Sequence, residues 1–269
     1  MTAPTARAAR RAVLAVRARI WPAACLLAPA CLLALSAAPA AALSCREMVF
    51  DDLPFTICEV DPAQDRLELF LKDDDGAILG NFAAIADARG PLAFGMNAGM
   101  YHPDRAPVGL YLDNGSEEMR LVTNPGPGNF GLLPNGVFCI GDDRADVVET
   151  LAYAENPPAC RFATQSGPML VIDGELHPRF LPDSTSRHIR NGVGTSADGD
   201  RVVFAISDWP VTFHEFGRLF RDGLGLPQAL YFDGNVSRLH APDIGRSDGG
   251  FAMGPVVGVL APADQPVDQ

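Results

Sequence analysis

The chain has 269 residues, of which 48% are hydrophobic and 20% are charged, a composition typical of a globular protein. It contains 33 acidic and 21 basic residues, which gives a formal net charge of −12 at pH 7. A negative surface repels the phosphates of nucleic acids and anionic lipids. The composition therefore argues against nucleic acid and membrane-surface partners.

The first 42 residues have the pattern of a secretory signal peptide. Arginines precede and enter an apolar run without acidic residues, and Ala38, Ala40 and Ala42 offer A-x-A cleavage sites. Two prolines interrupt the run, which argues against a permanent transmembrane anchor. A twin-arginine signal and a lipid anchor are weaker alternatives. We predict a signal peptide at 1–42 and a secreted, periplasmic protein with no stable membrane anchor after cleavage.

Four cysteines remain after this segment, Cys45, Cys58, Cys139 and Cys160. An exported protein folds in an oxidising compartment, and four cysteines allow three pairings. We favour Cys45 with Cys58 and Cys139 with Cys160, because both pairs close short loops. A zinc site is poorly supported, because no C-x-x-C spacing occurs.

The N-terminal half, from residue 59 to about 176, has the pattern of short strands joined by tight turns. Asn114-Gly115 and Asp173-Gly174 each stand between apolar runs, which predicts two-residue β-hairpins. This half should be largely antiparallel sheet. Residues 263–269 are predicted to form a flexible tail.

The second half predicts a strand, a helix and a second strand. Residues 201–207 and 228–232 are apolar runs, and the segment between them has helical spacing. Thr212 and Glu215 form a T-x-x-E capping box, and Gly225 suits the C-terminal cap. A crossover of this length normally joins parallel strands. The predicted fold class is α+β, with a mixed sheet that has antiparallel hairpins in the N-terminal half and this parallel unit in the C-terminal half.

Polar residues follow or lie between these two strands: Asp208, Glu215, Asp233 and Ser237. Ligands in open α/β sheets bind at the carboxyl ends of the strands. Paired carboxylates there can divide the roles of acid, base and nucleophile in glycoside cleavage. The structural interpretation is that Asp233-Gly234 is an ordinary turn pair, Glu215 caps the helix and Asp208 ends a strand. Local spacing alone favours that interpretation.

Two segments offer polar groups beside glycine. Asn97 and Gly99 interrupt an apolar strand, where an amide could hold a sugar hydroxyl and a glycine could equally serve a bulge. Gln165, Ser166 and Gly167 precede another strand and could bind ligand oxygens or only begin the strand.

A third segment is basic. Arg187, His188 and Arg190 precede the strand at 201–207, and arginine can bind a phosphate or a carboxylate through two parallel hydrogen bonds. A basic segment near paired carboxylates favours an anionic ligand.

Other kinds of site are poorly supported. Gly245–Gly249 matches G-x-S-x-G, but a strand follows it and no histidine comes after His240, so we reject a serine-hydrolase site. The histidines show no i, i+2 or i+4 pair, so no metal site is predicted. No cofactor is required, and a structural calcium ion held by loop oxygens stays open.

Five segments in order resemble the phosphodiester glycosidase domain family. They are NAGMY from Asn97, NFGLLPNGVF from Asn129, ATQSGPMLV from Ala163, RHIRNGVG from Arg187 and YFDGNVS from Tyr231. They span nearly the whole mature chain, so we predict a phosphodiester glycosidase-like domain at 43–262. The sequence departs from the family pattern at Asn235-Val236, where further glycines are known.

The resemblance implies a hydrolase that cleaves the glycosidic bond of a sugar 1-phosphodiester, with a sugar-phosphate or glycan substrate. The residues that match the family pattern are Asn97, Gly99, Gln165, Ser166, Gly167, Pro168, Arg190, Gly192, Gly194, Asp233, Gly234 and Ser237, with Glu215 at an acidic position.

These matches suggest a division of roles. Arg190, with Arg187, would bind the phosphate, and Asp233 would stabilise the oxocarbenium-like centre or activate water. Asp208 or Glu215 would be the second carboxylate. Asn97, Gln165 and Ser237 would hold sugar or phosphate oxygens.

Two other functions stay open from the sequence. The same fold could be a non-catalytic module that binds glycan or cell-envelope material. An enzyme at this site could also cleave the phosphoryl bond in place of the glycosidic bond.

Overall fold

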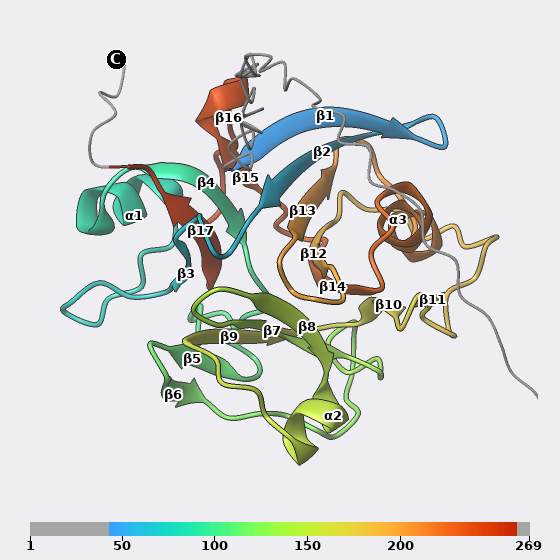
Figure 1. Cartoon of the computed structure of the whole chain (residues 1–269), viewed down its shortest axis with the longest axis horizontal. Coiled ribbons are helices and arrows are strands. Elements are labelled where there is room, and N and C mark those ends of the chain that lie inside the picture. Colours follow the sequence, from blue (N-terminus) through green and yellow to red (C-terminus); the bar gives the residue numbers. More distant parts are fainter. Residues whose placement is uncertain (1–42, 263–269) are drawn as a thin grey trace, which may run out of the picture. The chain divides into compact units, whose positions relative to one another are not determined.

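The structure is a computed structural model that describes residues 43–262, and the predicted signal peptide and tail lie outside this range. The described strands form three sheets (Figure 1). The seven-stranded sheet has the order β1 (Ser44–Phe50), β2 (Leu53–Val60), β13 (Val202–Ser207), β12 (Asn191–Thr195), β14 (Gln228–Asp233), β10 (Met169–Ile172) and β11 (Glu175–Leu176).

The two smaller sheets have five strands each. One has the order β16 (Arg246–Ser247), β15 (Leu239–Ala241), β4 (Leu92–Asn97), β17 (Val256–Leu260) and β3 (Leu67–Phe70). The other has the order β6 (Ser116–Met119), β5 (Tyr111–Asp113), β9 (Phe162–Ser166), β7 (Gly136–Ile140) and β8 (Ala145–Glu149). The α-helices of the described chain are short: α1 (Phe82–Arg89), α2 (Thr150–Glu155) and α3 (Phe213–Arg218).

The predicted parallel strand pair is wrong. β13 and β14 do not pair with each other, because β12 lies between them and pairs antiparallel with both. The connection through α3 therefore joins β13 to β14 across β12, whereas we predicted that it joins two neighbouring strands. The strand pairings described are antiparallel throughout, so the fold is sheet-rich with no mixed sheet. Two strands antiparallel to one neighbour share a direction, so β13 and β14 still end at the same edge.

Both predicted hairpins are confirmed. Asn114-Gly115 joins β5 to β6, and Asp173-Gly174 joins β10 to β11. The φ angles are +46° and +77° in the first turn and +50° and +83° in the second. Positive φ at both turn residues matches the right-handed twist of the flanking strands, which is why Asn-Gly and Asp-Gly are favoured there.

The predicted helix start is also confirmed. Thr212 Oγ1 accepts the backbone N–H of Glu215, and the Glu215 carboxylate accepts the backbone N–H of Thr212, so the capping box is complete. A π-helical turn, Leu219–Gly223, extends α3, and Gly225 follows it at a φ of +68°. A residue in this left-handed conformation terminates the helix, as predicted.

The two predicted disulfides are present. Cys45 and Cys58 face each other across the β1–β2 hairpin, and Cys139 on β7 is bonded to Cys160, just before β9. The bonded cysteines are 13 and 21 residues apart in the sequence, so both bonds close short loops, as predicted.

The three sheets share one apolar core. Phe204 on β13 packs on Phe94 of β4 and on Phe138 of β7, with ring centroids 4.8 and 5.8 Å apart. All three rings are fully buried. Edge-to-face and tilted rings at these distances are favourable beyond their apolar burial. One residue from each sheet thus meets at this contact.

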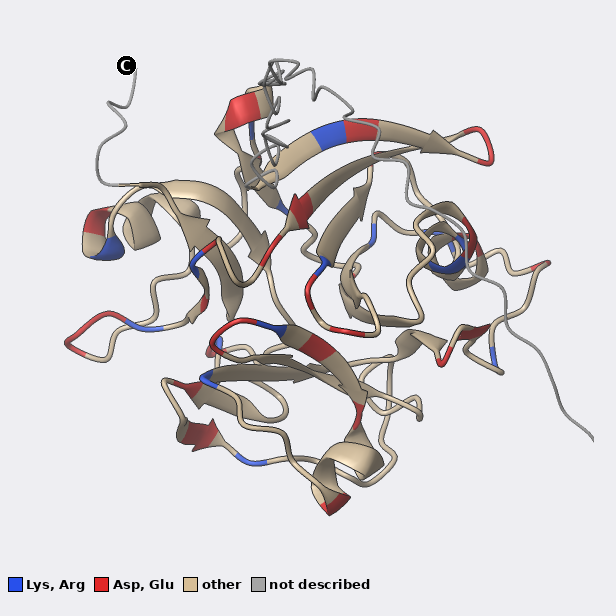
Figure 2. Ribbon diagram, in the orientation of Figure 1, with Lys and Arg blue, Asp and Glu red and all other residues tan. Residues whose placement is uncertain are grey.

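Acidic residues stand in many exposed loops, such as 73–75 and 142–143, in agreement with the negative composition (Figure 2). In the part of the chain that the structure describes, no helix has the length and apolar content needed to cross a membrane.

Candidate active site

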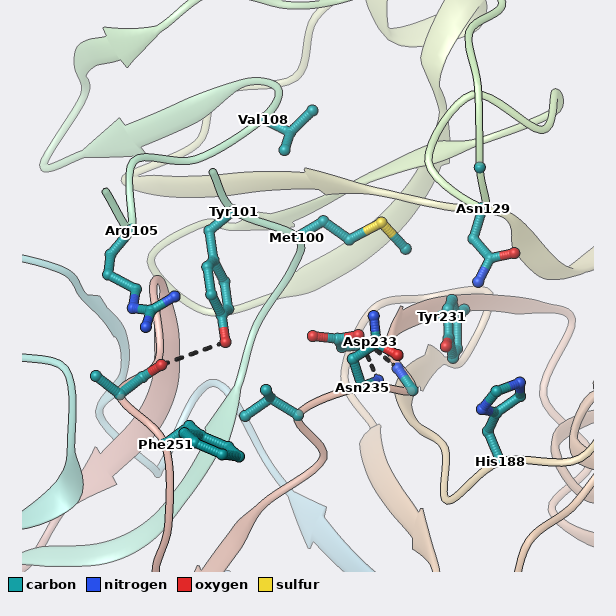
Figure 3. Close-up of a pocket in the computed structure, with 14 residues that line it drawn as sticks. Met100, Tyr101, Arg105, Val108, Asn129, His188, Tyr231, Asp233, Asn235 and Phe251 are labelled. Carbon is teal, nitrogen blue, oxygen red and sulfur yellow. Dashed lines mark hydrogen bonds between the residues drawn. The ribbon is translucent and has the colours of Figure 1, made fainter. Parts of the chain in front are cut away.

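A pocket of about 560 Å³ opens at the carboxyl end of β14, a volume that suits a small-molecule ligand. Five parts of the chain form its wall: Met100, Tyr101, Arg105, Val108, Gly128, Asn129, His188, Tyr231, Asp233, Gly234, Asn235, Val236, Phe251 and Ala252. In Figure 3 Asp233 lies near the centre, with Tyr101 on one side and Tyr231 and His188 on the other.

Asp233 is the last residue of β14, and an irregularity in the strand pairing sets its direction. Asp233 pairs with Asn191 of β12, but the next residue of β12, Gly192, pairs with Tyr231, so Phe232 is an extra residue. Bulges of this kind redirect side chains and are frequent beside functional sites. Among the residues described, Asp233 is the one carboxylate on the pocket wall.

The Asp233 carboxylate is held by backbone amides. Oδ1 accepts hydrogen bonds from the N–H groups of Gly234 at 2.6 Å and Asn235 at 2.9 Å. Burial is the larger effect and raises the pKa of Asp233 above its usual range, while these amides act in the opposite direction. A carboxylate that is partly desolvated but still ionisable is suited to accept a proton from water.

A buried amide pair supports the end of β14. Asn97 Nδ2 donates to Asn191 Oδ1 at 3.2 Å, and Asn191 Nδ2 donates to Asn97 Oδ1 at 2.9 Å. Asn191 Oδ1 also accepts the backbone N–H of Asp233, and Ser237 Oγ lies 3.1 Å from the backbone oxygen of Asp233. Asn97 and Ser237, predicted to bind substrate, lie behind the wall and stabilise the strand end that presents Asp233.

Tyr231 lines the pocket, and Arg190 packs behind it. Arg190 is only 1% exposed, and its guanidinium carbon lies 3.7 Å from the ring centroid of Phe213 and 5.4 Å from that of Tyr231. Nε donates to the backbone oxygen of Val211 at 2.9 Å. Nη1 has no hydrogen-bond partner within residues 43–262, and burial lowers the pKa of Arg190. The sequence predicted an arginine that contacts a ligand directly, whereas Arg190 is not part of the wall.

The opposite wall carries Tyr101 and Arg105. Arg105 lies at the tip of a loop and its guanidinium carbon is 5.3 Å from the centroid of the Tyr101 ring. In the described range it forms no ion pair, so its charge is available to a ligand. The Tyr101 hydroxyl donates to the backbone oxygen of Ala252 at 3.4 Å, and burial followed by the Asp233 charge raises the pKa of Tyr101.

Two predicted carboxylates are occupied elsewhere. Glu215 receives two hydrogen bonds from Arg187, at 2.8 and 2.7 Å, besides those of the capping box. Asp208 forms an ion pair with Arg246 at 2.6 Å and accepts from the Thr56 hydroxyl. None of Glu215, Arg187 and Asp208 lines the pocket, so the structure does not bring them together with Asp233.

The segment with Gln165, Ser166 and Gly167 also lies behind the pocket. Gln165 is buried and bonds the backbone N–H and C=O of Val122, and Ser166 Oγ donates to the backbone oxygen of Phe232. A Cβ on Gly167 or Gly99 would crowd neighbouring atoms. These residues pack the strands that carry the site. Of the predicted substrate-binding residues, His188 and Gly234 lie on the wall.

Sequence reasoning missed several wall residues. Tyr101, Asn129 and Tyr231 lie in the segments NAGMY, NFGLLPNGVF and YFDGNVS that resemble the family, so the resemblance could have indicated them. Arg105 and Phe251 lie in loops without a periodic pattern, and no local signal indicates them. In the described chain, no group of three or more His, Cys, Asp or Glu side chains is placed to hold a metal ion.

Gly234 leaves space for the Tyr231 hydroxyl, because a Cβ at this position would overlap that oxygen. We expect Gly234→Ala to displace Tyr231 or the Asp233 loop and to lower activity at this site about 100-fold, the cost of a small misplacement. The matched control is Gly249→Ala, since a Cβ on Gly249 meets nothing within 4 Å. Equal activity of the two variants, measured as kcat/KM, would contradict the assigned contact.

Comparisons with known proteins agree with the resemblance seen in the sequence. The sequence model of the phosphodiester glycosidase family matches residues 91–241. The chain belongs to the phosphodiester glycosidase family. Among curated relatives, the uncharacterized protein YigE of Escherichia coli (strain K12) is 33% identical over 213 residues, which cover 77% of this chain and 83% of YigE.

Solved structures show the same fold. The catalytic domain of zebrafish N-acetylglucosamine-1-phosphodiester alpha-N-acetylglucosaminidase, auto-inhibited by its pro-peptide, has a TM-score of 0.56 at 12% identity, with 82% of each chain covered. A hypothetical protein from Synechocystis has a TM-score of 0.54 at 12% identity, with 81% of this chain and 61% of that chain covered. Residues 91–241, which match the family model, contain every wall residue of the pocket except Phe251 and Ala252.

Proposed function

We propose that this phosphodiester glycosidase family member is a hydrolase that cleaves the glycosidic bond of a sugar 1-phosphodiester. The observation that carries the proposal is a lone carboxylate, Asp233, in a pocket with one unpaired arginine on its wall, Arg105, and a second, Arg190, packed behind Tyr231. A single carboxylate suits water activation, and unpaired cations suit an anionic substrate.

Three arginines supply the positive charge. Arg105 is on the wall, Arg190 packs behind Tyr231, and Arg238 is 7% exposed near Tyr101. None of them forms an ion pair within residues 43–262. Burying a charge without a partner is unfavourable. Arg190 and Arg238 are both buried without a carboxylate partner in the described chain, which favours a ligand that supplies the negative charge. This local field contrasts with the formal net charge of −12 of the whole chain.

The chemistry needs only one carboxylate. Cleavage of the bond between the anomeric carbon and the phosphate oxygen leaves a phosphate monoester, which is largely a dianion at neutral pH because its second pKa is about 6. The leaving group therefore needs no proton, unlike the alcohol released in ordinary glycoside cleavage. Asp233 takes a proton from the attacking water, whose oxygen bonds to the anomeric carbon, or stabilises positive charge there.

The remaining wall residues suggest a placement of the substrate. Arg105 would face the phosphate, in place of the Arg190 and Arg187 proposed from the sequence, because Arg190 packs behind Tyr231 and Arg187 is engaged by Glu215. Asn129, His188 and Asn235 would hold sugar oxygens. The two disulfides support folding in an oxidising compartment, and we propose a secreted, periplasmic protein.

The decisive experiment is hydrolysis of a panel of sugar 1-phosphodiesters in oxygen-18 water. We expect release of free sugar, with the label in the sugar hydroxyl. Label in the phosphate would show cleavage of the phosphoryl bond and overturn the proposal. If no sugar is released but glycans are retained on a binding array, the protein is a binding module.

A further inference from the structure

We infer that Tyr231 is a catalytic residue, whose hydroxyl donates a hydrogen bond to a non-bridging oxygen of the phosphate while the glycosidic bond breaks. Arg190 and Asn129 act through Tyr231 as positioning residues. This inference rests on the proposed function, and it gives a role to a residue to which the sequence analysis assigned none.

The position of the hydroxyl supports this role. Tyr231 is 1% exposed and lines the pocket, and its oxygen lies where a Cβ on Gly234 would be. The hydroxyl is therefore next to the residue that follows Asp233. In a ligand whose anomeric carbon faces Asp233, the phosphorus lies two bonds from that carbon and the non-bridging oxygens lie three bonds from it, within reach of the same region.

The hydrogen bonding of Tyr231 supports donation into the pocket. A tyrosine hydroxyl has one proton to donate and can also accept. Burial raises the pKa of Tyr231, while the Arg190 charge and hydrogen bonding by Arg190 and Asn129 act to lower it. The Arg190 guanidinium can only donate hydrogen bonds. In none of the hydrogen bonds found within residues 43–262 does the Tyr231 hydroxyl act as the donor, so its proton is available to a ligand.

The neighbouring tyrosine is arranged differently. Tyr101 lines the opposite wall, but its hydroxyl donates to the backbone oxygen of Ala252. Its proton is therefore committed within the protein. Of the two tyrosines beside Asp233, Tyr231 alone has a donor that faces the ligand space.

The reaction increases the charge at the place where Tyr231 donates. A phosphodiester carries one negative charge, and the bond between the anomeric carbon and oxygen breaks with both electrons staying on the phosphate. The released monoester then carries two negative charges, and the proton of the attacking water goes to Asp233 and on to solvent. A preorganised donor at this oxygen stabilises the transition state more than the bound substrate. Tyr231 keeps its own proton throughout.

A phosphorothioate substrate tests the contact. Sulfur accepts hydrogen bonds poorly, and replacing one non-bridging oxygen gives two diastereomers that place sulfur on different sides of the phosphate. We expect the wild type to hydrolyse one diastereomer about 10- to 100-fold more slowly, the range for a lost hydrogen bond to a charged group. Tyr231→Phe should lower kcat/KM on the oxygen substrate by a similar factor and remove the difference between the diastereomers.

Controls separate this role from a structural one. Tyr153→Phe removes a hydroxyl that lies outside the pocket, near Cys160, and should leave rates and stereochemical preference unchanged. The Tm of each variant reports whether it is folded. If Tyr231→Phe is folded and keeps the preference of the wild type, the inference is wrong while the proposed function stands. If the wild type releases no sugar from any phosphodiester, the proposed function and this inference both fail.

Discussion

Asp233→Asn is expected to lower the release of free sugar about 1,000-fold, within the range for removal of a general base. Both amide hydrogen bonds to Asp233 use Oδ1, so an asparagine oxygen can keep them and the loop should stay in place. The loss would then report the missing negative charge. Measurement of kcat/KM with the same sugar 1-phosphodiester tests this expectation.

The same variant should be more stable than the wild type at pH 7. Burial raises the pKa of Asp233, so the folded chain binds this proton more tightly than the unfolded chain does. Ionisation above the raised pKa therefore disfavours the folded state, and asparagine removes that effect. The gain in Tm should vanish as the pH falls through the raised pKa, because the wild-type carboxyl is then neutral too.

The activity of the wild type should also change as the pH passes the raised pKa of Asp233. A base must be ionised, so kcat/KM should fall as the pH drops through the raised pKa of Asp233. Asp173→Asn is the matched control, since Asp173-Gly174 is another turn pair whose side chain meets Gln228, away from the pocket. If Asp173→Asn lost as much activity as Asp233→Asn, the role of Asp233 would be rejected.

Arg190 should be required for activity without contacting the substrate. We expect Arg190→Met to lower kcat/KM about 100-fold, because the Tyr231 hydroxyl loses a fixed neighbour and the pocket loses a buried charge. The preference between phosphorothioate diastereomers should also fall, which a purely structural role would not produce. Arg201→Met is the control, since Arg201 pairs with Glu59 on the seven-stranded sheet.

The stability of the Arg190 variants should separate packing from charge. Arg190→Ala leaves a cavity at a fully buried position and should destabilise the fold by about 2 to 5 kcal/mol. Arg190→Met fills most of that volume and removes an unpaired buried charge, so its Tm should fall less. A folded Arg190→Met protein with the activity and preference of the wild type would contradict the role assigned to Arg190.

Local patterns predicted the features that depend on neighbours in the sequence. Asn114-Gly115, Asp173-Gly174 and the Thr212–Glu215 capping box need contacts across only a few residues, and both disulfides close short loops. Asp233 was also identified as the leading candidate, because the family motif around it is contiguous in the chain. The hairpin, helix-start and disulfide predictions succeeded because the determining interactions lie within one segment, and the role of Asp233 stays a prediction.

Short segments of the sequence were enough to predict the hairpins, the helix start, the disulfide pairing and the family. Other features follow only from long-range packing: β12 separates β13 from β14, Glu215 and Asp208 pair with Arg187 and Arg246, and Arg190 is buried behind Tyr231. Burial and desolvation depend on every segment packed around a residue. The pocket wall comes from five separate parts of the chain, so no single segment could reveal it.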